Sequence, residues 1–390
     1  MRPASEVERR RLNDLFAELC AIPSPFGRER AIADRVAGDL TRLGFEVAED
    51  DAAAGTGAEC GNLLARIPGR SDRWVMLCAH LDTVPHDGAV EPVLVDGGWE
   101  SAGHTILGAD NKAAVAVLMA VAQRAAVEGC PIGVELVLTV SEENALAGAK
   151  AFDVGRLRSR SGFAFDHASP VGEVVVASPT YYRLKAEFHG SAAHAGIRPE
   201  AGRSAILAAS KAIAAMALGR LDAETTANVG SITGGVGGTN IVPEHCAFLA
   251  EARSLSDAAV ETAIAEMVDH CYDAGNDPAC ECDVDVDVER LFSGYRHRTA
   301  APGVLAAEAA LRACGYEPRR ILTGGGSDAN AFEANGLHCI NLANGTERNH
   351  ESSERVSQVA LEGMLDVTFA LLDELAESES TAAAGQPAPS

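Results

Sequence analysis

The 390-residue chain is poor in basic residues: 32 Lys and Arg stand against 56 Asp and Glu, which gives a formal net charge of −24. Proteins that bind nucleic acid need clustered Lys and Arg to displace the counterions of the phosphates. The most basic run is Arg9 to Arg11, and it is typical of the solvent face of a first helix. The composition therefore argues against a nucleic-acid partner.

Long apolar runs are also missing. No stretch reaches the roughly 20 apolar residues of a membrane-spanning helix, and residues 1 to 12 are rich in charge, unlike a secretory signal. The ten cysteines are scattered, many within apolar segments, as free thiols in a reduced interior are. Cys280 and Cys282 have neither zinc-knuckle nor CxxC spacing, so we interpret them as packing residues. We expect a cytoplasmic protein without a membrane segment.

What is present is enough hydrophobic sequence, 47% of the residues, for two domains. Strands and helices alternate through residues 1–177, which predicts a mixed, partly parallel sheet covered by helices. Residues 178–290 follow the order βαββαβ and predict an inserted ferredoxin-like lid for dimerisation. Residues 291–376 should return to the first domain and end in a helix over 353–375. Residues 377–390 have the composition of a disordered tail.

Aspartates at alternate positions, Asp283, Asp285 and Asp287, precede the end of the expected lid domain. They lack the glycine turn and the terminal glutamate of a calcium-binding loop. We therefore interpret them as the charged solvent face of an edge strand, where charge opposes sheet-to-sheet sticking.

Three hydrophobic runs end in potential metal ligands. The run from Val75 leads to His80 and Asp82, the run from Val134 to Glu142 and Glu143, and the run from Gly162 to Asp166 and His167. In open α/β sheets, ligands bind at the carboxyl ends of the strands. Carboxylates and imidazoles are the donors that divalent ions such as zinc require. Together these endings predict a metal site.

Asp110 and the acidic pair permit two interpretations each. Asp110 begins a largely apolar helix, either as its N-cap or as a carboxylate that bridges two metal ions. Glu142 and Glu143 either face solvent or point in different directions from the strand end, so that one ligates a metal and the other faces the bound water.

A bridging Asp110, together with one glutamate that ligates a metal and one that faces the bound water, suits metal-assisted amide hydrolysis. Two zinc ions about 3.5 to 4 Å apart lower the pKa of a bound water and polarise the scissile carbonyl. A carboxylate must then carry the proton of the water to the leaving nitrogen, and Glu142 is the candidate. Asp82 would accept a hydrogen bond from the His80 ring and thereby orient it toward the metal.

These motifs resemble those of a known family in order and spacing. His80-Leu-Asp82, Gly108-Ala-Asp-Asn-Lys112, Ser141-Glu-Glu143 and Asn349-His350-Glu351 are similar to motifs of the co-catalytic zinc exopeptidases, which include peptidase T, aminoacylase and acetylornithine deacetylase. The resemblance covers roughly residues 5 to 376. Further matches are Ala193-His-Ala-Gly196, Gly237-Gly-Thr-Asn240-Ile-Val-Pro243, Glu251-Ala-Arg253 and Gly324-Gly-Gly-Ser-Asp328-Ala, and the last most resembles the peptidase T-like branch.

The resemblance implies two zinc ions per chain, with cobalt or manganese as possible replacements. One ion would be held by His80, Asp110 and Asp166. The other would be held by Asp110, Glu143 and His350, so that Asp110 bridges them. The resemblance also implies a cis peptide bond between Asp110 and Asn111.

The remaining implied roles concern catalysis and substrate. Glu142 would be the general base, and His194 would reach from the lid across a homodimer to support the developing oxyanion. The substrate contacts would be Asn240, Arg253, Gly326 and Ser327. His167, where relatives carry small residues, is either a loop histidine or an additional group behind the metal ligands.

The function expected from the resemblance is hydrolysis of short peptides by a dizinc enzyme similar to a tripeptide aminopeptidase, through a metal-bound water activated by Glu142. An N-acyl amino acid deacylase or a dipeptidase would use the same machinery with a different pocket. A non-catalytic peptide-binding or metal-binding protein is disfavoured, because metal binding alone does not need Glu142.

Overall fold

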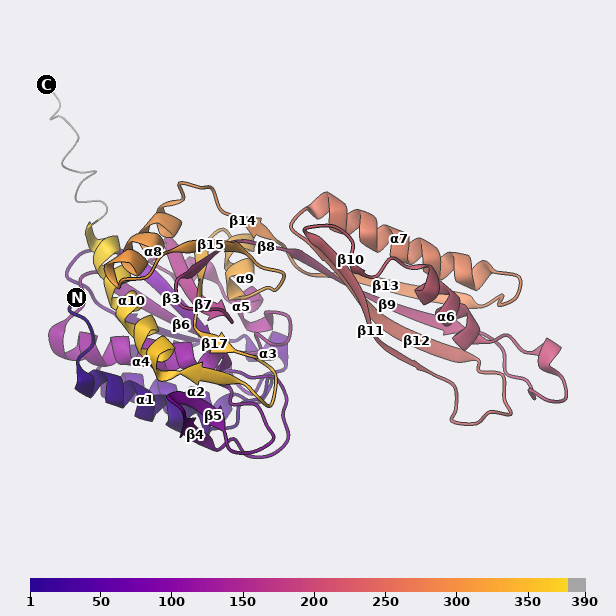
Figure 1. Cartoon of the computed structure of the whole chain (residues 1–390), viewed down its shortest axis with the longest axis horizontal. Helices are drawn as coiled ribbons and strands as arrows, with labels where there is room; N and C mark the ends of the chain where they lie inside the picture. The colour runs from indigo at the N-terminus through magenta and orange to yellow at the C-terminus, as the bar shows by residue number, and fades with distance from the viewer. Residues whose placement is uncertain (378–390) are drawn as a thin grey trace, which may run out of the picture. The chain divides into compact units, whose positions relative to one another are not determined.

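The structure is a computed structural model that describes residues 1–377. It contains two compact units, shown with their elements in Figure 1. The first unit comprises residues 1–176, 297–322 and those from 327 onward, and the second comprises 177–296 and 323–326. The second unit thus ends at Arg296 rather than at the predicted residue 290, because β14 (Tyr295–Arg296) pairs with Ser178 and Ala177. The predicted tail, apart from Glu377, lies outside the described residues.

The first unit is built on a mixed sheet, in the order β1-β2-β6-β3-β7-β16-β8 with β15 beside β8; the strand order continues with β14, whose residues belong to the second unit. Its central strands β6, β3, β7 and β16 are mutually parallel, whereas β1, β2 and β8 pair antiparallel. The bounds are β1 Glu46–Glu49, β2 Leu63–Ile67, β3 Trp74–His80, β6 Gly133–Thr139, β7 Ser161–His167, β8 Glu173–Ser178, β15 Arg319–Leu322 and β16 His338–Ala343. The predicted mixed, partly parallel sheet is confirmed.

Helices cover both faces of this sheet. Successive side chains of a strand point to opposite faces, so a buried strand presents apolar side chains to helices on each side. Val75, Leu77 and Ala79 of β3 pack into a core with α1 (Glu6–Cys20), α2 (Arg30–Arg42), α4 (Ala109–Glu128), α8 (Pro302–Ala313) and α10 (Gln358–Glu377). Cys78 points to the opposite face, where its Sγ lies 3.7 Å from Oδ2 of Asp328 in α9 (Asp328–Ala334). His80 follows the same alternation and shares that second face.

The last helix begins later than predicted. The sequence predicted a helix from residue 353, but α10 starts at Gln358, since residues 355–357 form β18. This strand belongs to a small sheet in the order β17-β18-β5-β4, formed by β17 (Thr346–Glu347), β18 (Arg355–Ser357), β5 (Gly98–Ser101) and β4 (Pro92–Val95).

The second unit has an antiparallel sheet in the order β10-β11-β12-β9-β13. Its elements are β9 Thr180–His189, α6 Ala205–Ala215, β10 Gly219–Arg220, β11 Thr225–Gly234, β12 His245–Ser254, α7 Asp257–Asn276 and β13 Asp283–Phe292. Leu184, Phe188 and Phe248 form its core together with α6 and α7. Apart from the short β10, the order is βαββαβ, so the inserted ferredoxin-like fold is confirmed. None of the helices within residues 1–377 is both long and apolar enough to cross a bilayer.

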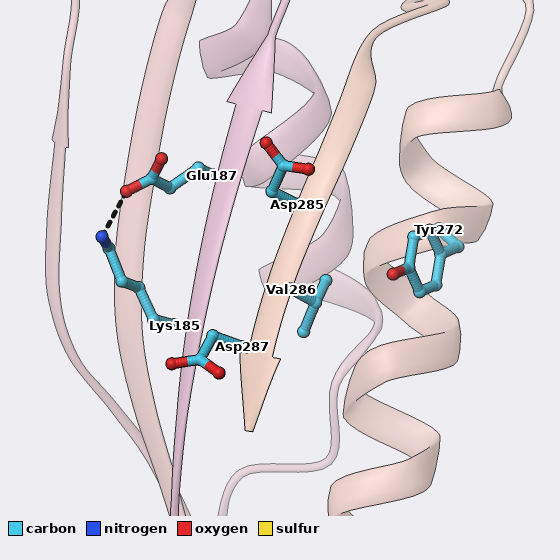
Figure 2. A pocket seen from close by; sticks show the side chains of 6 residues that line it. All are labelled: Lys185, Glu187, Tyr272, Asp285, Val286 and Asp287. Carbon is cyan, nitrogen blue, oxygen red and sulfur yellow. Dashed lines mark ion pairs between the residues drawn. The ribbon is translucent and has the colours of Figure 1, made fainter. Parts of the chain in front are cut away.

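Strand β13 is an edge of this sheet, and its aspartates Asp283, Asp285 and Asp287 are exposed. Figure 2 shows the residues that line a pocket around Asp285 and Asp287, with the Lys185 to Glu187 ion pair on β9 beside them and Tyr272 of α7 beyond β13. The predicted charged face of an edge strand is confirmed.

Candidate metal centre and active site

The parallel strands bring the predicted ligands to one edge of the sheet. His80 ends β3, Asp166 lies near the end of β7, and Glu142 and Glu143 follow β6. Because β6, β3 and β7 are adjacent and parallel, their carboxyl ends meet at this edge. Asp110 is supplied by the first turn of α4.

Asp110 lies between the two histidines. Its Oδ1 is 3.3 Å from Nε2 of His80, and its Oδ2 is 3.3 Å from Nε2 of His350. His80 Nε2 is also 3.7 Å from Oδ1 of Asp166, and His350 Nε2 is 2.8 Å from Oε1 of Glu143. The peptide bond after Asp110 is cis, as the resemblance implied.

This donor set suits divalent ions. Ligand atoms of His80, Asp110 and Glu143 all lie within 4.8 Å of one another, and so do those of His80, Glu142 and Asp166. Two imidazoles and a group of carboxylates match the nitrogen and oxygen donors of zinc, cobalt or manganese sites. Glu142, only 8% exposed, is thus close enough to His80 and Asp166 to face an ion or its bound water.

Burial and neighbouring charges shift the pKa values here. Burial, reinforced by the negative charge of Asp166, raises the pKa of Glu142 well above its ordinary value. Hydrogen bonds to Asp110 and Glu143 raise the pKa of His350 to about 10. Although burial opposes ionisation of Asp110, hydrogen bonds from His350 and His80 hold its pKa below the usual range. The cluster therefore concentrates negative charge that a bound cation would neutralise.

Asp82 makes contacts that differ from the prediction. The Nδ1 atom of His80 is 2.9 Å from the backbone carbonyl oxygen of Asp82 and 3.6 Å from its carboxylate. The carboxylate instead accepts hydrogen bonds of 3.0 Å from the backbone N–H groups of Glu142 and Glu143. Asp82 thus orients His80 mainly through its backbone and holds the acidic pair through its side chain.

Three polar groups support the segments that carry the ligands, and two of them, the buried Glu29 and Glu354, were not singled out from the sequence. Asn349 donates a 2.8 Å hydrogen bond to Oδ2 of Asp110. The carboxylate of Glu29 accepts from both N–H and hydroxyl of Ser141, each at 3.0 Å. Glu354 accepts from three backbone N–H groups of the segment that carries Asp110. The sequence contains no local signal for the last two, since each lies far along the chain from the groups it binds.

The Gly324–Asp328 segment has a structural explanation at several positions. A Cβ on Gly326 would lie 2.3 Å from the ring of Phe292. Ser327, 1% exposed, is the N-cap of α9 and accepts a 3.1 Å hydrogen bond from Asn341. The substrate contacts expected from Gly326 and Ser327 stay predictions. Asp328 is buried, which raises its pKa to about 7, and it accepts a hydrogen bond from Thr139.

His194 and Asn240 lie at one end of the second unit. The backbone N–H of Ala195 donates to the carbonyl of Asn240 at 2.9 Å, and His194 forms a bridge with Ile241. The exposed His194 ring accepts a 3.2 Å hydrogen bond at Nδ1 from the N–H of Gly196. The neutral ring would then carry its proton at Nε2, where it can be donated.

Arg253 lies toward the opposite end of β12 from Asn240, which precedes that strand. Its Nε and Nη2 bond the two carboxylate oxygens of Glu251 at 3.0 and 3.1 Å, and its guanidinium lies 4.0 Å from the centre of the Tyr181 ring. Its charge is therefore already partly compensated within the second unit.

The structure does not decide whether His167 is a loop histidine or an additional group behind the metal ligands. Its Nδ1 lies 2.8 Å from the hydroxyl of Ser169, and burial lowers its pKa. It occupies the end of β7 directly after Asp166.

Known proteins resemble this chain in both sequence and fold. A model of peptidase family M28 matches residues 62–177, and a model of the peptidase dimerisation domain matches residues 179–277. The crystal structure of aminopeptidase PepT from Bacillus cereus ATCC 10987 is 37% identical, with a TM-score of 0.84 over 94% of this chain and 99% of that chain. A tripeptidase structure from Staphylococcus aureus is 32% identical, with a TM-score of 0.89 over 95% and 99%.

The uncharacterized protein YqjE of Bacillus subtilis (strain 168) is 36% identical over 373 residues, which are 95% of this chain and the whole of that protein. Identity at this level over whole chains extends well beyond the four metal-site motifs. The chain belongs to the co-catalytic exopeptidase family that contains peptidase T, in its peptidase T-like branch.

Proposed function

We propose that this protein is a dizinc aminopeptidase that hydrolyses short peptides, tripeptides among them. The observation that carries the proposal is the position of Asp110, whose two carboxylate oxygens face His80 and His350 at 3.3 Å each. One carboxylate that faces two separate imidazoles is suited to bridging two ions. The similarity to a PepT aminopeptidase and a tripeptidase along nearly the whole chain supports the substrate class.

His80 and Asp166 would hold one ion, Glu143 and His350 the other, and Asp110 both. When bound, the two ions lower the pKa of water and polarise the scissile carbonyl. Glu142 takes the proton from the attacking water and delivers it to the leaving nitrogen. Its burial favours this role, because a raised pKa makes the carboxylate a stronger base near neutral pH.

We further propose that the enzyme acts as a homodimer. At about 3.3 Å per strand residue, Asn240, before the start of β12, lies far from Arg253, near its end. One lid therefore cannot present both residues to the same small substrate. A second copy supplying His194 and Asn240 would resolve this separation, and the match to a peptidase dimerisation domain supports it.

The β11 side of the lid sheet, which the short β10 covers only at Thr226 and Ala227, is the better interface for such a dimer. The other edge, β13, exposes three aspartates that would repel their copies. In contrast, β11 carries no charged residue, and Ile232 and Val236 nearby are 49% and 72% exposed. Ile206 of the adjoining α6 is 38% exposed as well. Two copies could pair their β11 edges and bury these side chains.

A cytoplasmic location is also part of the proposal. All ten cysteines lie within residues 1–377 and are free, nine of them buried. Free thiols in such number are typical of proteins that stay in a reducing compartment.

The test is metal content per chain, measured together with hydrolysis of tripeptides, dipeptides and N-acetyl amino acids in the presence of zinc, cobalt or manganese. Close to two ions per chain with turnover of free-amine tripeptides is the expected result. A preference for acylated amino acids would identify a deacylase instead. Two bound ions without any turnover would contradict an enzymatic role.

A further inference from the structure

Glu354 is a buried carboxylate with all its bonds directed at one backbone segment. It is 2% exposed. Its Oε2 accepts hydrogen bonds from the N–H groups of Leu107 and Gly108 at 2.9 and 2.7 Å, and its Oε1 accepts from the N–H of Asp110 at 2.9 Å. Burying a carboxylate is unfavourable unless such bonds compensate it, so this arrangement holds the carboxylate and the segment in one geometry.

The two segments joined here each supply ligands to the metal centre. Asp110 is the carboxylate between the two histidines. Glu354 lies four residues after His350, and its own N–H donates to the carbonyl of Glu351 at 3.0 Å. Glu354 therefore links the loop of His350 to the start of α4 across 244 residues of sequence.

Glu354 is not placed as a metal ligand itself. Both of its oxygens are engaged by backbone N–H groups. Its contact with the centre is thus indirect, through the backbone of Asp110.

We propose that Glu354 is a positioning residue, which fixes the Asp110 backbone so that its carboxylate faces His80 and His350 together. The inference rests on the proposed function, in that Asp110 must bridge two ions. Groups that orient metal ligands in this way typically change metal affinity or activity by about 10- to 100-fold when substituted. A glutamine at this position would turn one acceptor into an N–H donor facing backbone N–H groups.

The test compares Glu354→Gln with Glu135→Gln in the full-length protein. Glu135 is a matched control: it is 0% exposed in β6 and its Oε2 accepts from the N–H groups of Arg158 and Ser159 at 2.9 Å each. It lies four residues before the end of its strand, away from the ligands. Both variants are titrated with Co²⁺ by visible absorption, and their metal-free unfolding is measured in urea.

We expect Glu354→Gln to weaken binding of at least one Co²⁺ by tenfold or more. Glu135→Gln should lower stability while its Co²⁺ affinities stay within about twofold of the wild type. Equal Co²⁺ titrations for the wild type and Glu354→Gln would overturn the positioning role alone. A wild-type protein that binds fewer than two Co²⁺ ions would overturn the proposed function together with it. If Glu354→Gln does not fold, Glu354→Asp, which keeps the charge but shortens the reach, replaces it under the same criteria.

Discussion

The carboxylate of Asp82 accepts a 3.0 Å hydrogen bond from the backbone N–H of Glu142. Its second oxygen accepts from the next N–H, that of Glu143, at the same distance. A side chain from the end of β3 thus fixes two consecutive residues after β6. One of them is the proposed base, and the other is a proposed ligand.

Asp82→Asn should lower kcat by about 10- to 100-fold and weaken binding of the ion that Glu143 would hold. The amide keeps one acceptor and places a donor against the other N–H, which displaces the acidic pair. His80 should stay in place, because its Nδ1 contacts the backbone carbonyl that the substitution leaves unchanged. The measurement is metal content beside steady-state kinetics. Loss of both ions would show instead that the side chain orients His80, as the sequence alone predicted.

Glu142→Ala and Glu143→Ala should separate catalysis from metal binding. We expect Glu142→Ala to keep both ions and lose at least about 100-fold in kcat, the lower range for general base catalysis. Glu143→Ala should lose metal, since Glu143 faces His350 at 2.8 Å. Metal analysis after dialysis, with peptide hydrolysis measured in parallel, distinguishes the two. The opposite pattern would exchange the two roles.

His194→Ala should abolish most activity without loss of metal, because His194 belongs to the second unit and the proposed ligands belong to the first. Mixing it with Glu142→Ala tests whether His194 acts across the dimer. In a mixed dimer, the site with an intact Glu142 would receive His194 from its partner.

Random subunit exchange between equal amounts of the two variants should then restore about one quarter of the wild-type rate, because half of the dimers contain one complete site. The two variants measured separately are the control. No recovery in a mixture shown to contain mixed dimers would mean that His194 serves its own chain.

Glu8→Gln should lower the free energy of unfolding at pH 7 by about 2 kcal/mol, the range for hydrogen bonds to charged groups. Glu8 Oε1 accepts a 2.7 Å bond from Arg124, whose side chain is 1% exposed. Although partial burial opposes its ionisation, Arg124 and Arg2 hold the pKa of Glu8 below the ordinary value.

The lowered pKa of Glu8 determines how its contribution to stability depends on pH. Because the pKa of Glu8 is lower in the folded state, its carboxylate contributes fully to the free energy of unfolding above its unfolded-state pKa of roughly 4.3. The contribution decreases progressively as the pH falls below that value. The difference between wild type and Glu8→Gln in urea unfolding should therefore shrink between pH 5 and pH 3. The exposed Glu6, in the same helix turn, provides the control, and Glu6→Gln should change stability by less than about 0.5 kcal/mol. A difference that is constant with pH would contradict the assignment.

The sequence by itself determined the two-domain organisation and the ligand candidates. Hydrophobic runs that stop at His80, Glu142 and Asp166 are local patterns, and parallel strands necessarily bring their ends to one edge. The alternating aspartates of β13 likewise showed their solvent face in the sequence alone. The start of α10 was misplaced, because pairing of residues 355–357 with a distant strand is invisible to helical periodicity.

Only the tertiary structure decided how the ligands are held. Glu354 meets the backbone of Asp110 across 244 residues, and Glu29 meets Ser141 across 112. No local spacing encodes such contacts, since a glutamate that clamps distant N–H groups looks in sequence like one that faces water. Ser327 showed the converse: its motif suggested substrate, and burial at the start of α9 gave its hydroxyl a partner within the fold. The sequence identified the residue types of the site, and tertiary packing determined which of their atoms form bonds within the fold and which are left to bind a ligand.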